Sequence, residues 1–266
     1  MAEILTNQTD LDRVFKRIEN DFGEFRRDQV DFAVKEIGRV RSEVAEMISE
    51  YSDSKGKVTR RRLNRLLEDL EDLEDVINEY GEDALNRVIN DTSEWTARRL
   101  NNDVGLSLSA DQFDRINGNV AKYVIDRFGE DGLVLSDRVW GLSQEIRDSL
   151  SQVIRSEILK GNSVNTIVTK IRRVYNNETW KIKRLARTES LTAHRAAISY
   201  SAEESEVVQW VRFHAGDDRS EACVAVEQRD KYGEGRGIYK PGDSEMFTPH
   251  PNCTSHMSYI IDERWL

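Results

Sequence analysis

Apolar residues recur at intervals of three, four or seven through most of the first hundred residues. One run begins after the plausible N-caps Thr9 and Asp10 and continues to Tyr51, and a second run extends from Leu63 to Ile89. This spacing places the apolar side chains on one face of an α-helix. A short segment of turn-forming residues separates the runs. The pattern therefore predicts two long helices that fold back as an antiparallel hairpin.

The composition favours long, exposed helices over a thick interior. Of the 266 residues, 33% are charged and 38% hydrophobic, and the mean hydropathy is -0.65. The net charge of -10 argues against a protein that coats nucleic acid, because such binding draws much of its affinity from Lys and Arg. We expect no membrane segment, since no window approaches about eighteen consecutive apolar residues and the N-terminus lacks a signal pattern.

Charge changes sign abruptly along the second predicted helix. Four arginines open it, at Arg60, Arg61, Arg62 and Arg65, and six acidic residues follow between Glu68 and Asp75. A solvated helix face with ion pairs is the ordinary interpretation. The alternative is a docking surface for an acidic partner, because the helix macrodipole does not favour cations at a helix start.

Further helices are expected after a Gly- and Ser-containing stretch at 101–111. They cover residues 112–128, 136–160 and 163–175, and a last helix contains Trp180.

The periodicity then changes, and segments 206–213, 238–239 and 256–261 read as short strands. The predicted fold is mainly α, with a long helical hairpin and a helical body followed by a small α+β C-terminal module. We assign the hairpin arm to 1–100, the body to 101–176 and the module to 177–266.

The C-terminal part carries five features in a fixed order. They are Ala-Arg-Thr-Glu on a helix at 186–189, an extended segment around Trp210, Asp-Arg-Ser-Glu-Ala-Cys at 218–223, Phe247 ahead of Pro249, and His-Pro-Asn-Cys at 250–253. Together they resemble the phage head morphogenesis family, which is named for the F protein of phage Mu and includes minor head proteins of tailed phages. The resemblance covers roughly residues 150–262. The residues expected to shape this module are Trp210, Asp218, Arg219, Pro249, Pro251 and Asn252.

The resemblance implies a protein without enzymatic activity. Such a protein would bind the phage portal protein during procapsid assembly in the host cytoplasm and be packaged inside the capsid near the portal. There it would assist DNA packaging or ejection. The implied partners are the portal protein, scaffold or capsid protein, and viral double-stranded DNA.

Two cysteines are too few for a disulfide scaffold, and both lie in the C-terminal module. Cys223, His250 and Cys253, with either His256 or His214, have the ligand types of a structural zinc site, which would add folding energy to a thinly cored module. A Cys223–Cys253 disulfide in the mature particle and two ordinary buried cysteines are the alternatives.

The most basic short segment lies on the predicted helix around Trp180. It combines that tryptophan with Lys181, Lys183, Arg184 and Arg187, and positions 180, 184 and 187 share a helix face. This face is a candidate contact for a phosphate backbone, and a solvated helix face is the ordinary alternative.

Two other functions remain open from the sequence. One is a metal-dependent nuclease, because Asp217, Asp218, His214 and His250 are residue types that bind and activate a hydrolytic water. No helix of useful length follows His250, which such nucleases need. The other is a general helical adaptor, which has the same exposed helices.

Overall fold

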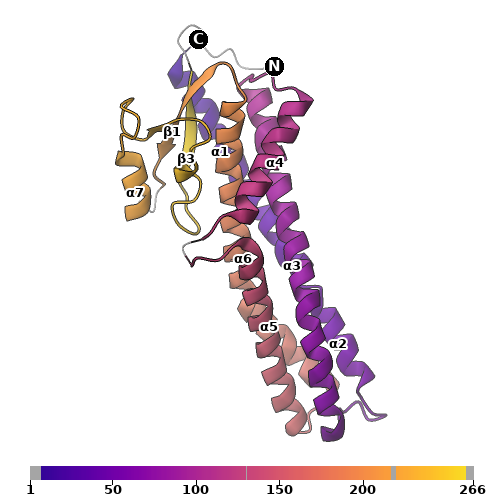
Figure 1. Cartoon of the computed structure of the whole chain (residues 1–266). Coiled ribbons are helices and arrows are strands. Elements are labelled where there is room, and N and C mark those ends of the chain that lie inside the picture. The colour runs from indigo at the N-terminus through magenta and orange to yellow at the C-terminus, as the bar shows by residue number, and fades with distance from the viewer. Residues whose placement is uncertain (1–6, 130, 217–219, 262–266) are drawn as a thin grey trace. The chain divides into compact units, whose positions relative to one another are not determined.

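The computed structural model describes residues 7–129, 131–216 and 220–261. These residues form a mainly helical chain that ends in a small three-stranded antiparallel sheet (Figure 1). The predicted fold class is confirmed. The elements are α1 (Gln8–Ile37), α2 (Val40–Glu50), α3 (Arg60–Asp103), α4 (Ala110–Asp126), α5 (Leu135–Leu159), α6 (Val164–Glu203), β1 (Val208–His214), α7 (Glu221–Gln228), β2 (Ile238–Tyr239), a 3-10 helix (Ser244–Met246) and β3 (His256–Ile261).

The chain divides into two compact units, each assembled from segments that are far apart in the sequence. Unit 1 contains residues 1–30, 86–132 and 186–266, and unit 2 contains residues 31–85 and 133–185. No helix among the described residues is long and apolar enough to cross a membrane.

Unit 2 is a helical bundle around one apolar core. The helices α2, α3, α5 and α6 each contribute aliphatic side chains at helical spacing, among them Val40, Val44, Ile48, Leu66, Leu70, Ile146, Leu150, Ile154, Ile167 and Ile171. Burial of such side chains is the main favourable contribution to folding. The hydroxyl of Tyr80 on α3 donates to Glu43 on α2, which places these two helices side by side as the predicted hairpin requires.

Two predicted helix boundaries are wrong. The first helix does not continue to Tyr51, because the chain turns at Gly38-Arg39 between α1 and α2. Glycine weakens a helix, and a Cβ at Gly38 would lie 2.8 Å from the carbonyl oxygen of Val34. Conversely, the helix expected to end at Tyr175 continues through α6. Tyr175 and Ile182 both lie in the core of unit 2, and this packing outweighs the weak helix propensity of the residues between them.

Unit 1 contains the sheet, whose strand order is β2-β1-β3. The three predicted strands are confirmed. Tyr259 of β3 is fully buried, its ring packs edge-on against Phe15 of α1 with centroids 4.8 Å apart, and its hydroxyl donates to the carbonyl of Ile198 on α6 at 2.7 Å. The sheet is therefore anchored on two long helices, α1 and α6, whose side chains complete its hydrophobic core.

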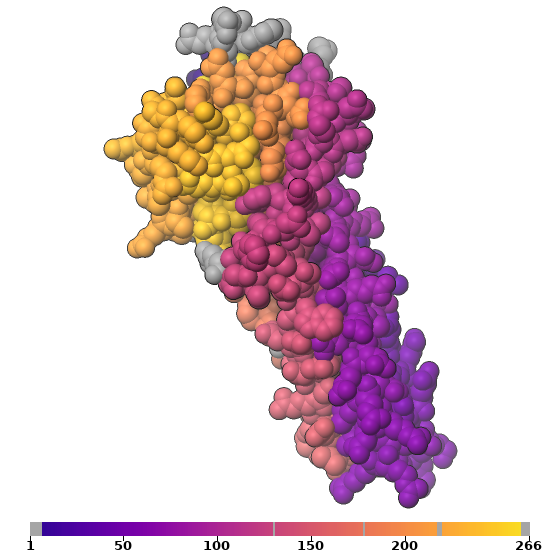
Figure 2. Space-filling model, viewed as in Figure 1, coloured from indigo at the N-terminus to yellow at the C-terminus, as the bar shows by residue number. Residues whose placement is uncertain are grey.

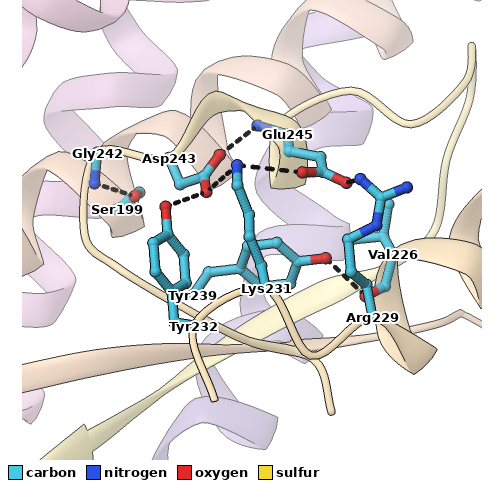
Figure 3. Close-up of polar contacts among 9 residues, drawn as sticks. All are labelled: Ser199, Val226, Arg229, Lys231, Tyr232, Tyr239, Gly242, Asp243 and Glu245. Carbon is cyan, nitrogen blue, oxygen red and sulfur yellow. Dashed lines mark hydrogen bonds and ion pairs between the residues drawn. The ribbon is translucent and has the colours of Figure 1, made fainter. Parts of the chain in front are cut away.

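A network of polar side chains holds the loops that follow α7 (Figure 3). Asp243 accepts hydrogen bonds from Lys231 Nζ at 2.7 Å, from Tyr232 Oη at 2.8 Å and from the backbone N–H of Glu245 at 3.1 Å. These donors hold the pKa of Asp243 below its ordinary value, although burial alone would raise it. Glu245 also pairs with Arg229. The loops thus gain order from ion pairs where a hydrophobic core is thin.

At Gly81 on α3, the packing of unit 2 leaves no room for a side chain. A Cβ at this position would stand 2.6 Å from Cγ1 of Val139 on α5, whereas a Cβ at Gly141 on α5 would have nothing within 4 Å. We expect Gly81→Ala to destabilise the protein by about 1–3 kcal/mol through overpacking. The matched control Gly141→Ala should stabilise it by about 0.5–1 kcal/mol. Urea denaturation of both variants measures the difference, and equal midpoints would contradict this packing.

Candidate metal centre

Three of the predicted ligands meet in unit 1. Cys223 Sγ lies 3.0 Å from His250 Nε2 and 3.3 Å from Cys253 Sγ, and the ligand atoms of all three residues lie within 4.8 Å of one another. Both cysteines are fully buried and neither forms a disulfide. The arrangement brings two sulfurs and one imidazole nitrogen together, a donor set typical of zinc sites.

Local backbone features aim these side chains at one another. Ser220 caps α7, because its Oγ accepts from the backbone N–H of Cys223 at 3.3 Å, and this fixes the cysteine in the first helical turn. At the other side, Asn252 adopts a left-handed φ of 56° in the turn from His250 to Cys253. His250 Nδ1 donates to the carbonyl of Pro251 at 2.9 Å, so its Nε2 is the nitrogen that faces Cys223. The tautomer needed for metal ligation is thereby set.

A buried arginine on α6 fastens the loop that carries Cys253. Arg195 Nε donates to the carbonyl of Phe247 at 2.6 Å, and Nη1 donates to the carbonyls of Cys253 at 3.0 Å and Ser255 at 3.1 Å. About two turns earlier in the helix, Thr188 Oγ1 accepts from the backbone N–H of Asn252 at 3.2 Å. The turn at 250–253 is therefore held on α6 by directional hydrogen bonds.

At the centre, burial and the neighbouring polar or charged groups shift the pKa values in opposite directions. Burial lowers the pKa of Arg195, while negative charge at Cys253, Glu19 and Cys223 acts in the other direction. Burial also raises the pKa of the Cys223 thiol, although hydrogen bonds from Ser220 and Ser255 favour the thiolate. Two thiolates would carry one more negative charge than the Arg195 guanidinium neutralises. A bound metal ion would supply the missing positive charge and favour deprotonation of the buried thiols.

The two remaining predicted ligands lie elsewhere. His214 on β1 is paired with His256 on β3, and their rings stack with centroids 4.7 Å apart. His214 Nε2 is within 2.9 Å of Ser258 Oγ. Strand register places the two histidines against each other, and neither belongs to the group formed by Cys223, His250 and Cys253. That one of them supplies a fourth ligand stays a prediction.

The other predicted module residues have varied settings. Trp210 is half-buried, and its ring lies 5.8 Å from that of Tyr232. Pro249 and Pro251 flank His250 in the turn described above. Asp217, Asp218 and Arg219 lie outside the described residues.

The residues of the predicted nucleic-acid contact lie on α6. Trp180 is 57% exposed, and Lys183 and Arg184 are also exposed. Lys181 pairs with Glu145 at 2.7 Å. Arg187 is half-buried and belongs to unit 1, whereas the other four residues belong to unit 2.

The sequence interpretation missed several buried polar residues on the helices of unit 1. Arg195 is one, and Glu189 is another, since it is fully buried and pairs with Arg127 at 2.6 Å. His194 contacts Glu19 at 3.1 Å and Thr96 at 2.8 Å. One signal was available: His194 and Arg195 interrupt the run Leu-Thr-Ala-His-Arg-Ala-Ala-Ile, where buried polar side chains need partners.

The stacked histidines make unit 1 sensitive to acid. Burial, followed by the charge of His256 and that of Arg212, lowers the pKa of His214 to about 4, well below the 6.5 of an unfolded chain. Between these values the unfolded chain binds a proton that the folded chain does not, so stability falls as the pH drops from about 6.5 towards 4. We expect His214→Gln to lose less thermal stability between pH 7 and pH 5 than the unaltered protein. Equal losses in both proteins would contradict this assignment.

In comparisons with known proteins, no family model, no curated protein and no solved structure matches the chain.

Proposed function

We propose that this chain is a minor head protein of a tailed phage or prophage, which binds the portal protein during procapsid assembly and is packaged inside the capsid. The proposal joins the resemblance described above to one observation: the separate parts of that motif meet at one place. The backbone of Asn252 bonds to Thr188, 64 residues away, and Cys223 meets both His250 and Cys253. Residues that are far apart in the sequence thus contact one another within one module.

The chemistry around the centre favours a structural role over turnover. Ser255 Oγ donates to Cys223 Sγ at 3.0 Å and accepts from the backbone N–H of Gly216 at 3.2 Å, and Arg195 is occupied with three carbonyls. Groups that are buried and engaged in holding loops are poorly placed to contact a substrate. This favours a protein without enzymatic activity over a metal-dependent nuclease.

Protein contacts are the principal interactions under this proposal. The helices are exposed and the net charge of the chain is -10. These properties favour binding to the portal protein, and to scaffold or capsid protein, over extensive binding to nucleic acid. Viral double-stranded DNA is a secondary partner, which the exposed Trp180, Lys183 and Arg184 would contact. The protein would then reside in the host cytoplasm during assembly and inside the capsid, near the portal, in the virion.

We further propose that Cys223, His250 and Cys253 hold a structural zinc ion. Across a tetrahedral zinc, two sulfurs stand about 3.8 Å apart. The observed 3.3 Å means that an ion would separate them by about half an ångström, a small adjustment. The ion would supply a cross-link between α7 and the turn at 250–253, and thereby folding energy for the module.

Metal analysis tests the zinc. Protein purified under reducing conditions should contain about one zinc per chain, and His250→Ala should lose the metal and unfold at a lower temperature. The control His256→Gln should retain zinc, because this histidine stacks on His214 outside the group. Protein that is free of zinc, and whose melting temperature is unchanged by a chelator, would exclude the site.

Co-expression with the portal protein encoded in the same genome tests the biological role. We expect a complex that survives size-exclusion chromatography, and the protein should be protected from protease in intact virions because the capsid encloses it. A protein that is absent from virions and does not bind the portal protein would contradict the proposal and leave the general helical adaptor.

Plasmid nicking with Mg²⁺, Mn²⁺ or Zn²⁺ tests the absence of enzymatic activity in the same preparation. No cleavage is expected. Cleavage that disappears in His250→Ala would establish the nuclease instead.

A further inference from the structure

One end of unit 2 concentrates positive charge in a chain whose net charge is -10. The turn between α2 and α3 meets the turn between α5 and α6 there, through a β-bridge between Lys57 and Ser163 and a hydrogen bond from the N–H of Val164 to the carbonyl of Gly56 at 3.0 Å. We call this end, formed by residues 52–65 and 159–163, the basic tip. Its first segment is part of the purple surface in Figure 2.

The basic tip carries six exposed cations on its first segment, namely Lys55, Lys57, Arg60, Arg61, Arg62 and Arg65. The single carboxylate between residues 52 and 65 is that of Asp53. Its Oδ1 already accepts the backbone N–H groups of Lys55 at 2.9 Å and Lys57 at 3.0 Å, so it serves to shape the turn. The positive charge of this segment is therefore largely uncompensated.

Neighbouring groups do not neutralise it. Arg62 Nη1 donates to the carbonyls of Tyr51 at 3.1 Å and Ser52 at 2.9 Å, which are uncharged. Across the described residues of the chain, the side chains of Lys55, Lys57, Arg61 and Arg65 form no salt bridge. The first turn of α3 contains no acidic residue, and the helix dipole adds positive potential at this end. An external anion would relieve this repulsion.

We propose that the basic tip binds a carboxylate-rich segment of a partner protein. Guanidinium groups form paired hydrogen bonds with carboxylates, and the arginines of the tip present several such groups within one helical turn. Leu159, which is 48% exposed, lies beside them, since Arg60 Nη2 approaches its carbonyl at 3.5 Å, and it offers an apolar contact. This inference goes beyond the proposed function, because it depends on unit 2 alone and holds whether or not the partner is a portal protein.

The charge pattern along α3 favours an acidic protein segment over nucleic acid. Six acidic residues follow the tip directly, at Glu68, Asp69, Glu71, Asp72, Glu74 and Asp75, and at 1.5 Å per residue they begin within about 5 Å of Arg65 along the helix. A duplex carries charge along its entire length and would meet these carboxylates. Tyr51, the nearby aromatic residue, is half-buried and its hydroxyl bonds to Asp69, so it offers no stacking surface for bases. A short acidic segment can match the tip and end there.

Fluorescence anisotropy with the full chain tests the proposal, with a labelled poly-L-glutamate peptide as the probe. The test variant neutralises the four cations without salt bridges, through Lys55→Gln, Lys57→Gln, Arg61→Gln and Arg65→Gln. The control variant neutralises four exposed cations elsewhere, through Lys16→Gln, Lys122→Gln, Arg172→Gln and Arg173→Gln. The two variants have the same net charge, so a difference between them reports the position of the charge. Circular dichroism and urea denaturation verify that both remain folded.

The test variant should bind the peptide more than about tenfold more weakly than the unaltered protein, while the control changes by less than about twofold. Binding should also weaken as salt is raised. Equal binding by both variants, or no binding of the peptide even at low salt, would overturn the proposal. A DNA duplex that binds the tip more tightly than the peptide would also overturn it and assign the tip to nucleic acid. None of these outcomes depends on the portal experiment, because that experiment measures a complex with the portal protein and protection inside virions, not binding of the acidic peptide.

Discussion

The C-terminal module depends on a buried guanidinium. Arg195 lies on the buried face of α6 and donates to three backbone carbonyls of the loop from Phe247 to Ser255. A cation removed from water is costly unless its donors are satisfied, and here the satisfied donors define the path of the loop. Together with the bond from Asn252 to Thr188, this side chain fixes the position of Cys253 and therefore its meeting with Cys223.

This dependence explains how a segment with so few strands keeps an ordered site. The sheet has three strands, of which β2 is two residues long, and its aromatic core is shared with α1 and α6. Ion pairs such as that between Lys231 and Asp243 arrange the remaining loops. The module is therefore better described as a set of loops fixed onto long helices than as a separately cored domain.

Periodicity alone predicts most of the helical fold, because apolar residues at helical spacing identify the core face whatever the partner helix is. The alternation at 206–213 and the short apolar runs at 238–239 and 256–261 likewise predict the strands. The break at Gly38 and the continuity of α6 past Tyr175 could not be predicted, since tertiary packing decides them. The helix α7 is not among the predicted helices, because eight residues are too few for a clear period.

For the candidate site, residue chemistry predicts the three members that meet and does not distinguish them from two further histidines that lie outside the group. Cys223, His250 and Cys253 are separated in sequence, and their ligand types alone indicated that they belong together. His214 and His256 have the same chemistry, yet strand register sets them against each other, and register depends on pairing that a single segment does not reveal. Arg195 was overlooked because a lone cation within a helix is ordinarily solvent-exposed.

The close approach of Gly81 to Val139 also settles how the long helices of unit 2 align. The apolar faces of α3 and α5 repeat every three or four residues, so a slide of one turn would leave aliphatic side chains still facing each other. Such a slide would bring Ile77 or Leu85 to the point where Val139 now faces Gly81. Neither side chain fits there, because even a Cβ would lie too close to Val139. The absence of a side chain at Gly81 thus selects one axial register of α3 against α5. Hydrophobic packing alone would allow several.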